Sequence, residues 1–173
     1  MSTLYVDNLQ PNLGSQVAIP NLKPLAGSVV QVVQAETQIE VVTGTSAAVP
    51  IGLSATITPT SATSKILITA SVQARVFKLG SADAAGGCQI YRDSTLIYVP
   101  VNNYEWGYCH PSEPSSSKSY RIPYELLDSP STTSAITYSI YGLCRNGDGL
   151  TQKVDFQDDG SYKSFITLME IAQ

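Results

Sequence analysis

The sequence has little charge of either sign. Only 14% of its 173 residues are Asp, Glu, Lys or Arg, against about 25% in an average soluble domain. The formal net charge is −4, and the ten Lys and Arg residues form no cluster. A protein that tracks nucleic-acid phosphates needs a basic stripe, so these features exclude nucleic acid as a partner.

Long apolar runs are missing as well. No run approaches the roughly 20 residues that a membrane-spanning helix requires, which excludes membrane insertion. The first residues, Met1 to Asp7, have neither the basic segment nor the apolar segment of a secretory signal. We therefore expect synthesis and assembly in a cytoplasm, without export through such a signal.

Cysteine and histidine are scarce. Cys88, Cys109 and Cys144 are widely spaced and form no C-x-x-C motif, so neither a disulfide framework nor a zinc ribbon is predicted. We interpret them as small apolar residues in strands, and the spacing leaves open whether any two of them pair. His110 is the single histidine, which excludes multi-histidine metal centres. No cofactor and no metal is expected.

Carboxylates are too scattered to predict catalysis. A glycosidase needs two of them across a cleft. The candidates are Glu105 with Glu113, and Asp155 with Asp158 and Asp159. Nothing in their spacing selects a pair, so we predict no enzyme. The stretch 155–160 offers oxygen ligands for Ca²⁺ but lacks the EF-hand pattern, and we expect its acidic residues to form turns and cap backbone N–H groups, with Ca²⁺ binding left open.

The sequence is rich in hydroxyl groups and in β-branched residues with a period of two. It contains 21 serines and 15 threonines. The clearest alternation runs from Ile66 to Val76, where every second residue is apolar, which predicts a half-buried strand. Further strands are expected at 29–35 and 38–42 (a strand pair or one bent strand), 53–58, 89–92, 95–99, 134–143 and 164–171. Residues 93–94 fit a tight hairpin turn.

These short strands, with no helical periodicity, predict an all-β fold: an antiparallel β-sandwich, jelly-roll-like, carrying an extended N-terminal arm. Long connections are expected at 80–87, 100–120 and 144–162. The polar, serine-rich stretch 111–119 favours an exposed loop.

Residues 1–28 differ in composition from the rest of the sequence. We predict that they form the arm and that residues 29–173 form the sandwich. Pro11, Pro20 and Pro24 interrupt every short apolar run and favour an extended chain. Apolar side chains nevertheless recur along it and call for a partner surface, which we expect to lie on another chain. They are Leu4, Val6, Leu9, Leu13, Val17, Ile19 and Leu22.

One predicted loop concentrates aromatic and amide side chains: Asn102, Asn103, Tyr104, Trp106 and Tyr108. Aromatic faces beside amides suit a sugar ring, which offers C–H surface for stacking and hydroxyls for hydrogen bonds. The alternative is that these rings fill the loop core or a subunit interface, where Tyr and Trp are also enriched.

Five separated blocks of the sequence form a recognisable set. The N-terminal block is Met1–Leu9 with Gly14 and Val17–Pro20, and the others are Gly27–Val33, Ile57–Ile68, Leu126–Tyr138 and Ile166–Ile171. Together these blocks resemble virion proteins of tailed phages, notably those that infect cyanobacteria and marine bacteria. The resemblance implies a trimeric β-sandwich head, attached through its N-terminal segment to the outer surface of a virion, with no catalytic residues to carry over.

Two roles fit this resemblance. One is a short tail fibre that binds a host receptor, for example a surface glycan. The other is a capsid cement or decoration protein that stabilises the head shell through contacts with the major capsid protein. The sequence has no repeat or coiled-coil shaft, which keeps the second role open. A soluble carbohydrate-binding module is the more distant alternative.

Overall fold

The computed structural model describes residues 23–100, 104, 106–148 and 151–173. These residues form strands and one short 3₁₀ helix (η2, Asp158–Gly160), with no α-helix among them. The all-β prediction is confirmed. The arm residues Leu4 to Leu22 and the loop residues Asn102, Asn103 and Glu105 lie outside the described residues.

The first sheet is built on the long strand β4. Its strands are β1 (Val29–Thr37), β2 (Val41–Thr43), β4 (Lys65–Leu79), β8 (Ser115–Asp128), β10 (Gln152–Phe156) and β11 (Ser164–Ile171). Along one edge of β4, β11 pairs with residues 65–71 and β10 with residues 74–78, so the two lie end to end. In the same way β1 pairs with β11 and β2 with β10, which confirms the bent-strand alternative for 29–42. The opposite edge of β4 pairs with β8.

The second sheet has the order β3-β9-β5-β6, with β7 also on β5. Its strands are β3 (Val49–Ile57), β5 (Ala84–Arg92), β6 (Thr95–Tyr98), β7 (Trp106–Cys109) and β9 (Ile136–Arg145). The strand β6 pairs with one end of β5 and β7 with the other. The expected hairpin turn at Asp93 and Ser94 joins β5 to β6 and is confirmed.

The strand order is that of a jelly roll. When each end-to-end pair counts as one strand, the described residues form eight strands, ordered 1-8-3-6 in the first sheet and 2-7-4-5 in the second. Two interlocked Greek keys of this kind define the double-sheet jelly roll. The core lies between the sheets, where alternate residues of β4 such as Ile66, Ile68 and Val72 are fully buried.

The predicted long connections are shorter than expected, because each contains strand residues. Ala84 already belongs to β5, the stretch 100–120 contains β7 and the start of β8, and 144–162 contains β10. The prediction of an exposed loop at 111–119 is wrong from Ser115 onward. Ser116 and Lys118 pair with Lys78 and Val76 of the long strand β4, so the backbone ladder rather than apolar side chains makes this part of β8 a strand.

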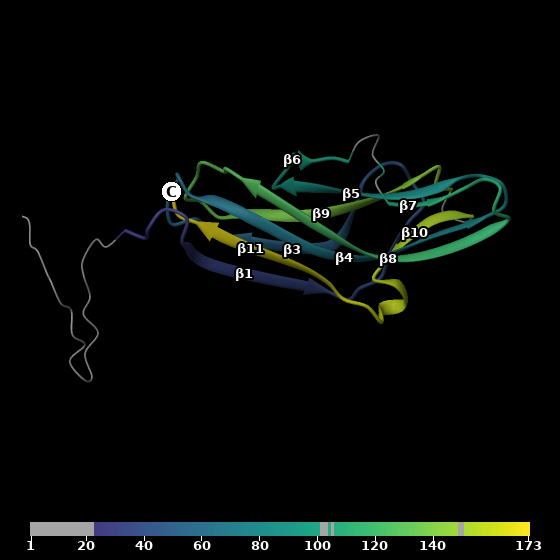
Figure 1. Ribbon diagram of the computed structural model, residues 1–173, viewed down its shortest axis with the longest axis horizontal. Helices are drawn as coiled ribbons and strands as arrows, with labels where there is room; N and C mark the ends of the chain where they lie inside the picture. Colours follow the sequence, from purple (N-terminus) through teal and green to yellow (C-terminus); the bar gives the residue numbers. More distant parts are fainter. Residues whose placement is uncertain (1–22, 101–103, 105, 149–150) are drawn as a thin grey trace, which may run out of the picture.

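The two ends of the sandwich carry different parts of the chain. The C-terminus and residues 23–28 lie at one end, and β7 and β10 lie toward the other (Figure 1). We call these the arm end and the distal end. The structure, over its described residues, has no helix long and apolar enough to cross a membrane.

Candidate functional site

Residues 23–28, the predicted root of the N-terminal arm, begin at the arm end, where backbone hydrogen bonds hold residues 25–28 in place. Gly27 N donates to Ala172 O at 2.8 Å, and Ala172 N donates to Ser28 O at 2.9 Å. The Ser28 hydroxyl donates in turn to Leu25 O. Residues 25–28 are therefore tied to the end of β11.

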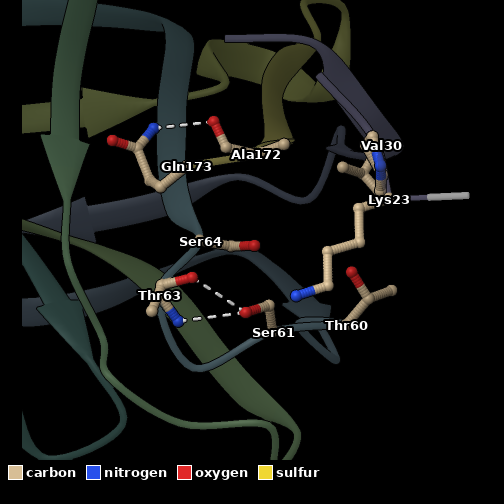
Figure 2. A pocket seen from close by; sticks show the side chains of 9 residues that line it. Lys23, Val30, Thr60, Ser61, Thr63, Ser64, Ala172 and Gln173 are labelled. Carbon is tan, nitrogen blue, oxygen red and sulfur yellow. Dashed lines mark hydrogen bonds between the residues drawn. The ribbon is translucent and has the colours of Figure 1, made fainter. Parts of the chain in front are cut away.

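A pocket of about 560 Å³ opens beside this root. Its lining combines hydroxyl groups from the connection between β3 and β4 with residues of the arm root and the C-terminus: Lys23, Pro24, Val30, Thr60, Ser61, Thr63, Ser64, Ala172 and Gln173. Figure 2 shows the Lys23 side chain extending across the pocket toward Thr60 and Ser61. We call this the arm-root pocket; its lining carries four hydroxyl groups and a single lysine beside apolar surface from Pro24, Val30 and Ala172.

A buried carboxylate lies next to this pocket. Glu170 is fully buried, and its carboxylate accepts hydrogen bonds from Gln31 Nε2 (2.6 Å), Thr60 N (2.8 Å) and Thr60 Oγ1 (2.7 Å). Burial alone would raise the pKa of this carboxyl, but hydrogen bonds from Gln31, Ser64 and Thr60 outweigh it and hold the pKa below its usual range. The ionised Glu170 therefore joins β1, β11 and the connection at Thr60.

At the distal end, a buried lysine organises the loops. Lys78 is fully buried, and its ammonium group donates to Gly80 O (3.0 Å), Ala82 O (3.0 Å) and His110 O (2.9 Å). Three carbonyl oxygens thus satisfy the three donors of the ammonium group. The sequence analysis missed Lys78, although it continues the inward-facing series that ends at Val76.

Two of the predicted glycan-contact residues gather around a cation at this end. The Arg145 guanidinium lies 5.4 Å from the ring centre of Tyr104 and 5.9 Å from that of Tyr108. Its Nε is 3.3 Å from Asp83 Oδ2, and Asp83 also accepts a hydrogen bond from Asn146. We call Tyr104, Tyr108, Arg145 and Asp83 the distal cluster. Tyr108 is 48% exposed and so leaves aromatic surface available to a ligand.

Trp106 is separated from these two tyrosines. Its indole packs directly over Gly86, meets the ring of Phe156 edge-on, and donates from Nε1 to the Tyr124 hydroxyl at 3.2 Å. Regular alternation would place Trp106 and Tyr108 on one face, but Gly107 between them has a φ of 72° and the pairing of β7 with β5 shifts register there, so Trp106 packs inward whereas Tyr108 is exposed. Asn102 and Asn103 lie outside the described residues, so the distal cluster contains Tyr104 and Tyr108 of the five predicted residues.

A second pocket opens at the side of the sandwich. It has a volume of about 330 Å³ and lies between β8 and the second sheet. We call it the lateral cleft; its lining is Ile90, Tyr98, Trp106, Ile122, Pro123, Tyr124, Glu125 and Leu126.

The acidic residues form ion pairs. Arg75 lies 2.6 Å from Asp155 and 2.9 Å from Asp158, and Lys153 lies 3.1 Å from the other oxygen of Asp155. Carboxylate oxygens of Glu40, Asp155 and Asp158 come within 4.8 Å of one another, a spacing that could hold a cation, but two basic side chains share this place. Glu113 lies 3.4 Å from Lys118, and its predicted partner Glu105 lies outside the described residues.

All three cysteines are buried, and none of them forms a disulfide. Burial, followed by the nearby carboxylates of Asp148 and Asp155, raises the pKa of Cys144 to about 12. Its thiol is therefore protonated at neutral pH and poorly nucleophilic. This agrees with the interpretation of the cysteines as small apolar strand residues.

A scan of protein-family models and a search of curated proteins gave no match. Among solved structures, the chain is similar to one from infectious bursal disease virus strain Gt, with a TM-score of 0.42 and 10% identity over 92% of this chain and 42% of that chain. A second chain, from a T13 particle of the same virus, gives a TM-score of 0.38 and 13% identity over 93% and 41%. This chain spans less than half the length of either. Likeness at this level carries no argument about function, and the jelly-roll fold is defined by the strand order itself.

Proposed function

We propose that this chain is a non-enzymatic structural protein on the outer surface of a tailed-phage virion. Residues 1–28 anchor it to another virion protein, and a homotrimeric sandwich is displayed outward. Its role is that of a short tail fibre that binds a receptor on the host. The proposal rests on the resemblance of the sequence to phage virion proteins and on one observation about the fold.

That observation is the separation of the two candidate surfaces. The arm root is tied to Ala172 at one end of the sandwich, and the distal cluster lies at the other. A protein held by its arm would therefore present Tyr104 and Tyr108 away from the particle. Three copies in one assembly would multiply weak contacts at both ends through effective concentration.

The distal cluster suits a glycan by its chemistry. Exposed aromatic surface on Tyr108 can stack on the C–H face of a sugar, while Arg145 and Asp83 offer a donor and an acceptor to its hydroxyls. The loops that carry these residues are fastened by Lys78, so the cluster is presented in a defined arrangement.

Locating the chain in a cryo-EM reconstruction of its parent particle tests the proposal. Density on the tail or at its vertex, with the distal end outward, is expected. Density on the capsid lattice would overturn the fibre role in favour of cement or decoration. Absence of the chain from the particle would overturn both and favour the soluble carbohydrate-binding module.

Receptor binding is tested by adsorption of particles to host cells. Tyr108→Ala is expected to lower adsorption at least several-fold while leaving incorporation into particles unchanged. Tyr162→Ala is the matched control, since Tyr162 is 51% exposed but lies near η2 outside the cluster. If both variants adsorb equally well, the distal cluster takes no part in receptor binding.

A further inference from the structure

The outward face of the first sheet carries an apolar row that crosses four strands. Val32 pairs with Met169, Met169 with Leu67, and Leu67 with Leu127, so the four side chains stand side by side. Strand alternation places Leu67 opposite to the core residues Ile66 and Ile68. Val32 is 56% exposed and Leu127 is 51% exposed. We call these four residues the apolar row.

Sheet faces that meet only water usually carry polar side chains. The neighbouring row, Gln34, Thr167, Thr69 and Glu125, follows this rule. A contiguous apolar patch on an otherwise hydroxyl-rich surface marks an interaction site.

The lateral cleft is a second apolar surface with a different shape. Ile122 and Leu126 point into the sandwich from β8 but stay partly exposed, because the edge of β8 away from β4 pairs with no strand of the described residues. Tyr98 and Trp106 face them from the second sheet. The row is a ridge on a sheet face, whereas the cleft is a recess at a sheet edge, and β8 contributes to both.

Two unlike surfaces of this kind suit a closed ring. In a three-fold ring every copy must present two different patches, one to each neighbour. We propose that the apolar row of one copy seats in the lateral cleft of the next, closing a ring of three; this inference rests on the homotrimer of the proposed function and names its interface. The occupant of each cleft is a second copy of this chain.

Charges beside the two surfaces agree with this pairing. Lys65 flanks the row on β4, and Glu125 lies at the lip of the cleft. Neither charged group has an ion-pair or hydrogen-bond partner within the described part of the chain. When the row of one copy meets the cleft of its neighbour, these opposite charges lie at the same interface, where they favour the correct partner and register.

The mass of the full chain in solution, measured by light scattering after gel filtration, tests the interface. The row variant combines Val32→Asp with Leu127→Asp, and the cleft variant is Leu126→Arg. The control combines Ser117→Asp with Ser119→Asp, which places the same charges on the outward face of β8 away from the row. Wild type and control are expected at the mass of three chains, and the row and cleft variants at the mass of one.

Mixing the two variants gives the sharper test. The row variant retains an intact cleft and the cleft variant an intact row, so one good interface can form but the ring cannot close. An equimolar mixture at high concentration is therefore expected at the mass of two chains. A cleft variant that forms dimers by itself would overturn the proposal in favour of a contact between two rows.

Other outcomes separate this inference from the proposed function. If the row variant keeps the mass of three chains, the interface is wrong while the trimer stands. A wild-type chain at the mass of one overturns the trimer itself, and the location on the particle is tested independently by cryo-EM. Melting curves report folding, and Glu125→Arg, an exposed change at the lip, replaces Leu126→Arg if that variant does not fold.

Discussion

At the scale of single residues, two glycines allow aromatic rings into the sandwich. A Cβ built on Gly86 would lie 2.2 Å from the indole of Trp106, and one on Gly142 would lie 2.2 Å from the ring of Phe156. No carbon atom can approach so closely without displacement of the ring. Each glycine therefore leaves the space that the aromatic ring packed on it occupies: Gly86 for Trp106 and Gly142 for Phe156.

Gly86→Ala is expected to lower the free energy of unfolding by about 1–3 kcal/mol, the usual cost of overpacking a core. Since Trp106 is the single tryptophan, a shift of its fluorescence emission will report the displaced ring directly. In a Trp106→Phe background the smaller ring relieves the collision, so the same substitution should cost less. Equal costs in both backgrounds would show that Trp106 is not the obstacle.

Glu170 gives the stability a defined dependence on pH. Its native pKa is below the unfolded value of about 4.3, so its contribution is complete above that pH and is lost as the pH falls through the native pKa. Glu170→Gln turns an acceptor into a donor facing Thr60 and should cost about 1–3 kcal/mol at pH 7. Urea unfolding at pH 7 and pH 3 measures both effects.

The difference between Glu170→Gln and wild type is expected to shrink at pH 3. Glu36→Gln is the control, because Glu36 is half-exposed and pairs only with Lys163 at the surface; it should change stability by less than about 0.5 kcal/mol. A Glu170→Gln difference that is equal at both pH values would contradict an ionised Glu170.

Sequence patterns identify inward-facing apolar residues better than inward-facing polar ones. Alternation from Ile66 to Val76 correctly predicted the buried face of β4. Lys78 occupies the next position of that series, but its burial depends in part on the carbonyl group of His110, 32 residues away, which reaches it only through the fold. The partners of Glu170 are still more distant in sequence, with Thr60 110 residues away and Gln31 139 residues away.

At the scale of elements, the strand pair β10 and β11 is interrupted at the same place as β1 and β2. The connection from Gln157 to Lys163 leaves the sheet there, and Gln157 N and Asp158 N bond back to Gln73 of β4. Arg75 forms ion pairs with Asp155 on β10 and with Asp158 in the connection, so it holds the connection 157–163 against the sheet.

Removal of Arg75 is expected to leave Asp155 buried with Lys153 as its only ion-pair partner among the described residues. Arg75→Gln should lower the free energy of unfolding by roughly 2 kcal/mol. This is less than the usual loss when a fully buried ion pair is broken, because Lys153 remains beside Asp155. The three carboxylates would then favour a cation, so Ca²⁺ should raise the melting temperature of this variant.

Wild type and an Arg121→Gln control are expected to melt at the same temperature with and without Ca²⁺. Arg121 lies on the outward face of β8 and bonds Ser71 and Lys163 O, away from the acidic cluster. Stabilisation of wild type by Ca²⁺ would show that the cation displaces Arg75.

Elements with apolar alternation were predictable, and elements held by backbone pairing were not. The strands β9 and β11 follow their patterns closely. The first five residues of β8 are four serines and a lysine and carry no apolar signal, yet β4 is long enough to pair with all fourteen residues of β8. The length of the partner strand β4 is a property of the sheet, so pairing along all of β8 cannot be inferred from the sequence of β8 alone.

At the scale of the whole molecule, the arm and the sandwich should be separable. A chain lacking residues 1–22 retains every described strand and the bonds between residues 27–28 and Ala172. We expect it to fold, to melt within a few degrees of the full chain and to be missing from particles. Thermal melting and immunoblots of purified particles check these outcomes.

A chain lacking residues 1–28 loses the two backbone hydrogen bonds to Ala172 as well. It should be less stable than the shorter deletion by about 1–2 kcal/mol while sharing its loss of incorporation. Incorporation of either truncated chain at the normal level would show that the arm is not the anchor.

The place of β11 and β10 in the first sheet also sets when that sheet can be completed during synthesis. They lie between β1/β2 and β4, although both of those neighbours leave the ribosome long before them. Until Ile171 emerges, β1 and the inner edge of β4 are open templates for pairing with other nascent chains. The first sheet can therefore be completed only after β11 has left the ribosome, and polysomes crowded with copies that still lack β11 are where misassembly would begin.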